Sequence, residues 1–197
     1  MLCILFAGTI GSAPNSNLPF HPGLTNGDYP KELADSLYSR SSSFLDSSRY
    51  AAALPPARQA LTLYTQIGDK PGEASALENV GTALMGMGKL DSAIINFELS
   101  LAIWQALGDR SEQASLMNSL GLAYQEESHY ELANAYFDSL LVVVRALGMY
   151  EQEPVALSNI GLNLEYLGQY KRSIDTSLKA LELYRKLKNV DGEAKTL

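Results

Sequence analysis

The sequence contains few cysteines, histidines and basic residues. Cys3 is the single cysteine, so neither a disulfide framework nor a cysteine metal cluster can form within one chain. The two histidines, His21 and His129, offer little material for a metal site. There are 15 Lys and Arg against 22 Asp and Glu, which gives a formal net charge of -7. Because nucleic acids and anionic membranes attract basic surfaces, we expect neither as a partner.

Long apolar runs are also missing. The run Leu2–Ile10 is too short to span a bilayer, and small residues up to Ala13 follow it. This order resembles the apolar core and cleavage region of a secretory signal. However, no Lys or Arg precedes the run, and Pro14 would follow a cleavage after Ala13. Two interpretations stay open: a signal remnant, which favours an extracytoplasmic over a cytoplasmic location, or an ordinary disordered or packed N-terminus.

Motifs of catalysis and of cofactor binding are missing as well. The sequence has no Gly-x-Ser-x-Gly elbow and no phosphate-binding loop. Glu126 and His129 stand three residues apart, a spacing that occurs in carboxylate-bridged metal sites. Their segment, EESHYE, instead matches a turn between two helices, where polar residues are expected. We therefore predict no enzyme activity, no metal site and no cofactor.

What the sequence does contain is a repeat with a period of 40 residues. The corner segments Ile67–Lys70, Leu107–Arg110 and Leu147–Tyr150 follow one another at this spacing, and Leu187–Val190 continues it. No insertion or deletion is needed across 120 residues. Such a strict period predicts an array of similar structural units.

Each unit contains two amphipathic segments separated by a breaker. The first has three large residues and a glycine at spacings of three, one and three, which places them on one helical face. The second has an alanine and, four residues later, an aromatic or a smaller residue. The first-segment markers are Leu77, Val80, Gly81 and Leu84; Met117, Leu120, Gly121 and Tyr124; and Leu157, Ile160, Gly161 and Leu164. The breakers are Gly88, Ser128 and Gly168, and the second-segment markers are Ala93 with Phe97, Ala133 with Phe137, and the weaker Ser173 with Ser177. An earlier, degenerate unit is marked by Leu37, Ser41, Phe44, Ala53, Ala57 and Ala60.

This pattern resembles the tetratricopeptide repeat over residues 31–197. The resemblance implies an all-α fold, an α-solenoid in which antiparallel helix pairs form a right-handed superhelix. We expect a leader or linker at residues 1–30, and an array over 31–197. Its helix pairs are expected at 31–66, 72–106, 112–146 and 152–187, with a truncated fifth unit at 192–197. Because a repeat that cannot bury its face is a poor terminus, we expect the chain to be a fragment of a longer protein.

The length of the repeat indicates which tetratricopeptide proteins the chain resembles most in its repeat pattern. The usual tetratricopeptide repeat has about 34 residues, whereas repeats of 40 with a Gly-Asp corner resemble those of G-protein-signalling modulators and kinesin light chains. They are also similar to arrays in some bacterial sensor kinases and regulators. The modulators favour Asn directly after the Leu-Gly pair, where this chain has Thr82, Leu122 and Leu162. Their particular ligand is therefore not carried over.

Two sets of residues are interpreted as packing. Small residues such as Gly121 and Ala133 let two helices approach closely, and Phe97 and Phe137 can fill the space that remains. Tyr64, Trp104 and Tyr184 recur at spacings of 40 and 80, with Val144 between them. Such a stripe could be a ligand platform, but we interpret it as core.

The resemblance also implies a binding site, because the first helices of this family line a concave groove. Asn residues there often hydrogen-bond a ligand backbone, and Asn79 and Asn159 match that position; the alternative is that these side chains are simply solvated. The candidate groove residues are Ser75, Glu78, Asn79, Thr82 and Met85, then Ser115, Asn118, Ser119, Leu122 and Gln125, then Val155, Ser158, Asn159, Leu162 and Glu165.

Charge indicates what such a groove would bind. Between Gly72 and Tyr170 the only basic residues are Lys89, Arg110 and Arg145, against thirteen Asp and Glu. A clamp for a C-terminal carboxylate would need Lys or Arg beside the Asn. Ser75, Ser115 and Val155 occupy the matching positions, so we expect no such clamp. A basic or amphipathic protein segment fits better.

Two functions follow as hypotheses. The first is a protein–protein interaction scaffold that binds a peptide or partner protein in the groove. The alternative is an input or sensor segment of a longer bacterial signalling protein, either a sensor kinase or a transcription regulator.

Overall fold

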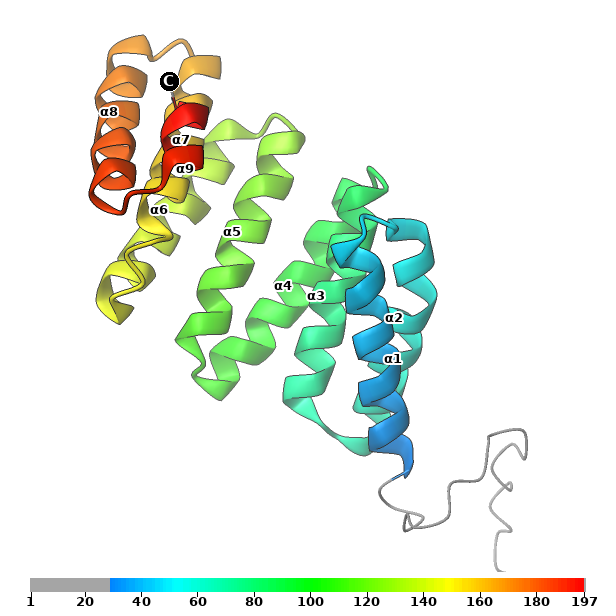
Figure 1. Ribbon diagram of the computed structural model, residues 1–197. Coiled ribbons are helices and arrows are strands. Elements are labelled where there is room, and N and C mark those ends of the chain that lie inside the picture. The colour runs from blue at the N-terminus through cyan, green and yellow to red at the C-terminus, as the bar shows by residue number, and fades with distance from the viewer. Residues whose placement is uncertain (1–28, 197) are drawn as a thin grey trace, which may run out of the picture.

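The structure is a computed structural model that describes residues 29–196; the predicted leader, apart from its last two residues, and Leu197 lie outside the described residues. Within residues 29–196 all regular secondary structure is helical. The helices are α1 (Tyr29–Asp46), α2 (Tyr50–Ile67), α3 (Lys70–Gly86), α4 (Leu90–Leu107), α5 (Arg110–Glu126), α6 (Tyr130–Leu147), α7 (Glu153–Tyr166), α8 (Tyr170–Lys186) and α9 (Val190–Thr196). The breaks fall where the repeat predicts them, and the predicted all-α solenoid of antiparallel helix pairs is confirmed (Figure 1).

The helices form two layers. Every helix contacts the next one along the chain, and further contacts join α1 to α3, α3 to α5, and α7 to α9. No comparable contacts join the even-numbered helices to one another within the described part of the chain. Because contacts between alternate helices occur only among the odd-numbered helices, these helices form the inner, concave layer, and the even-numbered helices form the outer layer. This arrangement is visible in Figure 1.

The turns repeat with the same period as the sequence. Gly68, Gly108 and Gly148 have left-handed φ angles of 75°, 76° and 71° at the ends of α2, α4 and α6. Glycine is favoured there because a Cβ atom makes this conformation costly. At the next corner the equivalent residue is Lys188, which has a φ of 55°. The backbone conformation is therefore kept even where glycine is not.

One corner departs from the pattern. Asp69 and Asp109 cap α3 and α5, because their carboxylates accept hydrogen bonds from backbone N–H groups of the first turn. The equivalent residue before α7 is Met149, which cannot accept such a bond. There α7 begins only at Glu153, without a side-chain cap. The α6–α7 corner is correspondingly longer than the two before it.

The core is built from the predicted small and aromatic residues. Phe97 and Phe137 are completely buried. A Cβ atom on Gly81 would lie 2.6 Å from the Phe97 ring, and one on Gly121 would lie 2.6 Å from the Phe137 ring. Tyr64, Trp104 and Tyr184 are buried as well, which confirms their interpretation as core. Within the described residues, no helix is long and apolar enough to cross a membrane.

Candidate binding groove

The predicted groove residues lie on the inner layer, on α3, α5 and α7. The repeat places them at equivalent positions, but the structure gives them different surroundings. The N-terminal part of the concave face, from α1 to α5, is tied together by internal hydrogen bonds. The C-terminal part, from α5 to α9, contains a pocket.

In the N-terminal part, Asn79 is buried and its side-chain N–H group donates a hydrogen bond to the Ser42 hydroxyl of α1 at 3.0 Å. The Ser115 hydroxyl donates to the Glu78 carboxylate at 3.2 Å, which joins α3 to α5. Glu78 and Asn79, two of the four predicted polar residues of α3, are therefore engaged within the protein. Thr82 and Met85 are half-buried, and Met85 packs against the core.

Burial raises the pKa of Glu78, and the nearby charge of Glu112 acts in the same direction, while the Ser115 hydrogen bond opposes it. Tyr38 of α1 is close to both carboxylates. Its pKa is raised by burial, and the charges of Glu78 and Glu112 contribute. Tyr38, Ser42 and Glu112 were not among the predicted groove residues. Tyr38 and Ser42 stand 40 residues before Glu78 and Thr82, so the period contained a signal for both, but the predicted groove began only in the next unit. Glu112 lies outside the predicted groove positions.

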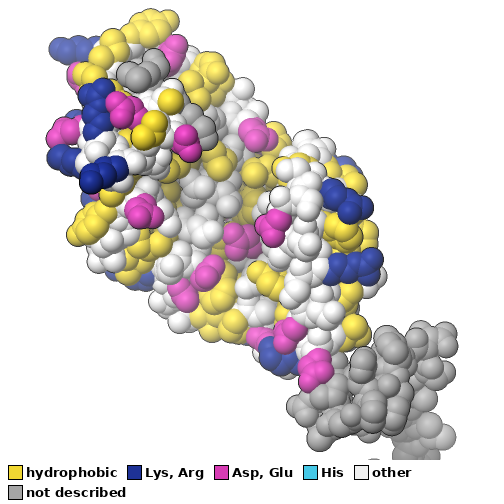
Figure 2. Space-filling view, in the orientation of Figure 1, with side chains coloured by type: hydrophobic (Ala, Val, Ile, Leu, Met, Phe, Trp, Pro, Cys, Tyr) yellow, Lys and Arg dark blue, Asp and Glu magenta, His cyan; other side chains and the backbone are white. Residues whose placement is uncertain are grey.

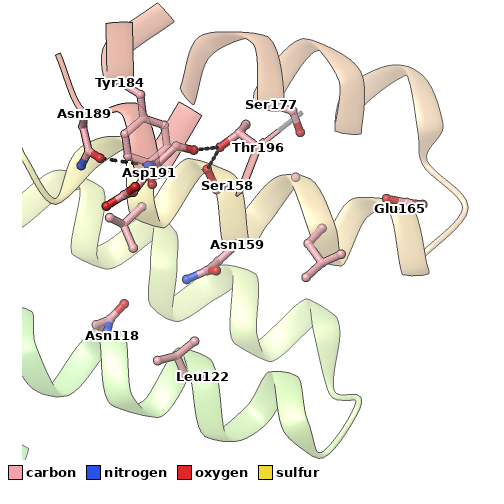
Figure 3. Close-up of a pocket in the computed structure, with 14 residues that line it drawn as sticks. Asn118, Leu122, Ser158, Asn159, Glu165, Ser177, Tyr184, Asn189, Asp191 and Thr196 are labelled. Carbon is pink, nitrogen blue, oxygen red and sulfur yellow. Dashed lines mark hydrogen bonds between the residues drawn. The ribbon is translucent and has the colours of Figure 1, made fainter. Parts of the chain in front are cut away.

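The C-terminal part contains a pocket of about 760 Å³ between α5, α7 and α9. Figure 3 shows Asn159 of α7 opposite Asn118 and Leu122 of α5. Leu162 and Glu165 continue the lining along α7. The structure thus brings together, in one pocket, seven predicted residues: Asn118, Leu122, Val155, Ser158, Asn159, Leu162 and Glu165.

The predicted serines and the glutamine of α5 and α7 differ in their hydrogen bonds. The Ser158 hydroxyl donates to the Pro154 carbonyl at 2.9 Å and lies 3.1 Å from the Thr196 hydroxyl. The Ser119 hydroxyl donates to the Ser115 carbonyl of its own helix. Gln125 lies outside the pocket, and its buried Oε1 has no hydrogen-bond partner within the described part of the chain.

The pocket also contains residues that the groove prediction did not include. Tyr184 of α8 and Asn189, Asp191 and Thr196 at α9 form its far wall (Figure 3). The Asn189 side chain accepts a hydrogen bond from the Gly192 N–H group at 2.9 Å, so it caps α9. The sequence contained a signal for this role, because Asn189 stands at the repeat position of the capping residues Asp69 and Asp109.

The electrostatics of the groove are acidic. None of the residues that line the pocket is Lys or Arg, whereas Glu165 and Asp191 are among them. Figure 2 shows acidic side chains over the hollowed middle of this face, and Lys and Arg towards its ends. Arg145 is held at a helix corner instead, where its guanidinium lies 2.6 Å from the Glu153 carboxylate.

Metal-binding clusters of His, Cys, Asp or Glu are not found among the described residues. His129 lies in the α5–α6 turn, directly before α6, with its Nδ1 atom 3.2 Å from the Glu127 carboxylate. Glu126, the residue paired with it in the sequence, is the last residue of α5.

Comparison with solved structures finds several helical arrays of this shape. Aspartyl phosphate phosphatase F from Bacillus subtilis aligns with a TM-score of 0.78 and 19% identity, over 84% of this chain and 43% of that one. The Rap conjugation gene regulator of a plasmid, in complex with the Phr* peptide, aligns at 0.70 and 18%, over 89% and 47%. A signal transduction ATPase with a tetratricopeptide repeat sensor, from Pyrococcus horikoshii, aligns at 0.76 and 14%, over 89% and 27%.

These identities establish a likeness of fold alone, and the chain spans less than half the length of each of these three proteins. Comparison with curated protein sequences finds no match. Family profiles described as tetratricopeptide repeat match residues 72–145 and 155–187, which together make up more than half of the chain. The chain therefore belongs to the tetratricopeptide repeat family.

Proposed function

We propose that this chain is a protein-interaction scaffold that holds a peptide or a segment of a partner protein between α5, α7 and α9. The observation that supports the proposal most directly is the pocket on the concave face. Within the described residues, no intramolecular hydrogen bond engages the side-chain amides of Asn118 and Asn159. Both amides are therefore free to bind a ligand, in contrast to that of Asn79.

The pocket chemistry indicates the class of ligand. An Asn side chain can donate and accept at once, so it can pair with an extended backbone whatever the ligand's sequence. Leu122 and Leu162 offer apolar contact, and Leu162 is 40% exposed. Glu165 and Asp191 favour positive charge. The expected ligand is therefore a basic or amphipathic segment, and the proposal requires no catalytic group.

A second function has support from the comparisons. The Pyrococcus horikoshii protein has a tetratricopeptide repeat sensor, and the plasmid regulator was solved with a peptide bound. An input or sensor role, in which peptide binding to this array controls an attached output domain, is therefore our alternative. An output domain encoded in the same gene would favour it over a free-standing scaffold.

The test uses a displayed library of random linear peptides selected against the chain. We expect the selected peptides to be enriched in Lys, Arg and apolar residues. Asn159→Ala should weaken a selected peptide by roughly 2- to 12-fold, because one net hydrogen bond contributes about 0.5–1.5 kcal/mol. The matched control is Asn96→Ala on α4, whose amide donates to the Ser92 carbonyl of its own helix.

Leu162→Lys is the second test variant, since it places a like charge beside a basic peptide. Circular dichroism verifies that each variant keeps its helical content. If neither Asn159→Ala nor Leu162→Lys changed the affinity of the selected peptides, the binding surface would lie elsewhere.

A further inference from the structure

A second hollow lies between the C-terminal halves of α2 and α4, with the first half of α3 between them. It has a volume of about 590 Å³, and its lining is mostly apolar. Leu61, Ile103 and Leu107 contribute to it, and Leu99 at its edge is 52% exposed. This hollow is separate from the proposed peptide pocket, which faces the concave side.

The hollow exists because side chains are small at this point of the repeat. Thr65 of α2 and Ala102 of α4 border it. One unit later the equivalent residues are Gln105 and Val142, which are larger. The two charged residues at the rim, Lys70 and Glu73, are 2.7 Å apart and neutralise each other. The hollow therefore suits an apolar, uncharged occupant.

We propose that the apolar N-terminal run of this chain, Leu2–Ile10, is a packed N-terminus rather than a signal remnant, and that it binds in this hollow. The run contains no charged residue, and neither do the residues from 11 to 27 at neutral pH, with His21 neutral. The hollow offers apolar contact and no unpaired charge. An apolar run without charged residues therefore fits it.

The start of α1 lies at the correct end of the molecule. Lys31 forms an ion pair with Asp69, the residue directly before Lys70 at the rim of the hollow. The chain that precedes α1 is therefore attached close to the site. Fully extended, residues 11–28 could reach at most roughly 60 Å, at about 3.3–3.6 Å per residue. Attachment also raises the effective concentration of the run to about the millimolar range, so a weak contact suffices.

Cys3 allows a direct test, because it is the only cysteine and lies within the run. Ala106→Cys and Ala102→Cys place a second thiol in the hollow of the full chain. The matched control is Ala146→Cys, since Ala146 is exposed at the equivalent position one unit later. The fraction of intramolecular disulfide is measured in a glutathione redox buffer by non-reducing electrophoresis and by peptide mass.

We expect at least one cysteine in the hollow to bond Cys3 about 10-fold more than the control does, which corresponds to about 1.4 kcal/mol of preference. Leu5→Asp with Phe6→Asp in the run should abolish this excess. Three results would overturn the proposal: equal bonding at all positions, bonding at none, or disulfide dimers that increase with protein concentration. Dimers would identify a second copy of the chain as the occupant.

Discussion

At the scale of single residues, the glycines of the inner layer differ in what an added methyl group would meet. On Gly121 a Cβ atom would lie 2.6 Å from the ring of Phe137, which is completely buried. On Gly161 it would lie 2.5 Å from the Ser177 hydroxyl, which can rotate away. In a helix, alanine is otherwise favoured over glycine by about 1 kcal/mol.

We therefore expect opposite effects from the same substitution. Gly121→Ala should lower the free energy of unfolding by about 1–3 kcal/mol, the usual cost of overpacking. Gly161→Ala should leave it unchanged or raise it by up to about 1 kcal/mol. Urea unfolding followed by circular dichroism measures both. An equal loss of unfolding free energy in the two variants would show that the Ser177 hydroxyl does not rotate away from the added methyl group.

Glu78 predicts a pH dependence. Its pKa is raised in the folded state, chiefly by burial, so protonation favours folding. The corresponding stability is fully present below the ordinary value of 4.5 and is lost as pH rises through the raised pKa. Glu78→Gln should therefore raise the melting temperature at pH 7, and the gain should shrink towards pH 4.

The control for this prediction is Glu182→Gln. Glu182 is exposed, and its pKa is lowered by the hydrogen bond from Lys186. Its substitution should not raise the melting temperature at pH 7. A gain from Glu78→Gln that is the same at both pH values would rule out titration as the cause.

At the scale of elements, the turns within helix pairs keep one backbone conformation with different residues. Ser48, Gly88, Ser128 and Gly168 stand at the same repeat position and all have positive φ. For a residue with a Cβ atom this conformation costs about 1–2 kcal/mol. Glycine avoids this cost, but it loses about 0.5–1 kcal/mol more conformational entropy on folding. The two serines therefore mark turns that are held under mild strain by the helices they join.

Exchange at this position should shift stability in both directions. Ser128→Gly should raise the free energy of unfolding by up to about 1 kcal/mol. Gly88→Ala should lower it by a similar amount, because nothing lies within 4 Å of the added Cβ atom and only the backbone is strained. Thermal or urea unfolding tests the pair. A loss of stability in Ser128→Gly would mean that the serine side chain makes a contact that outweighs the strain.

At the scale of the whole molecule, negative charge should act on binding mainly through the association rate. The net charge is -7, and the pocket contains acidic but no basic residues. Charges in solution are screened beyond roughly 10 Å at 0.1 M salt. The association rate of a Lys- or Arg-containing peptide should therefore fall by about 10-fold between low and high salt.

Stopped-flow or surface-based kinetics can measure that rate. The control is the same peptide with its Lys and Arg replaced by Gln, whose association rate should respond little to salt. If the basic peptide shows the same salt response as the neutral one, the acidic surface does not steer the ligand.

Much of this architecture could be predicted from the sequence because a repeat is a local property. The period of 40 residues, the helix breaks near the recurring glycines and serines, and the close approach of Gly121 to the second helix all follow from residues near one another in the chain. The recurring spacing within the sequence also indicated that Tyr64, Trp104 and Tyr184 belong to the core, and all three are buried. The late start of α7 was harder to see, since it depends on the missing cap at Met149.

The sequence alone determined which residues share the inner face, but only the tertiary structure decided which of them are available to a ligand. Asn79 and Asn159 occupy the same repeat position, yet Asn79 is buried against Ser42 of α1, whereas Asn159 lies in the pocket beside α5 and α9. The physical reason is that a side chain's position on its helix depends on local periodicity. Its exposure and its hydrogen-bond partners depend on the neighbouring helices, whose residues come from other parts of the chain.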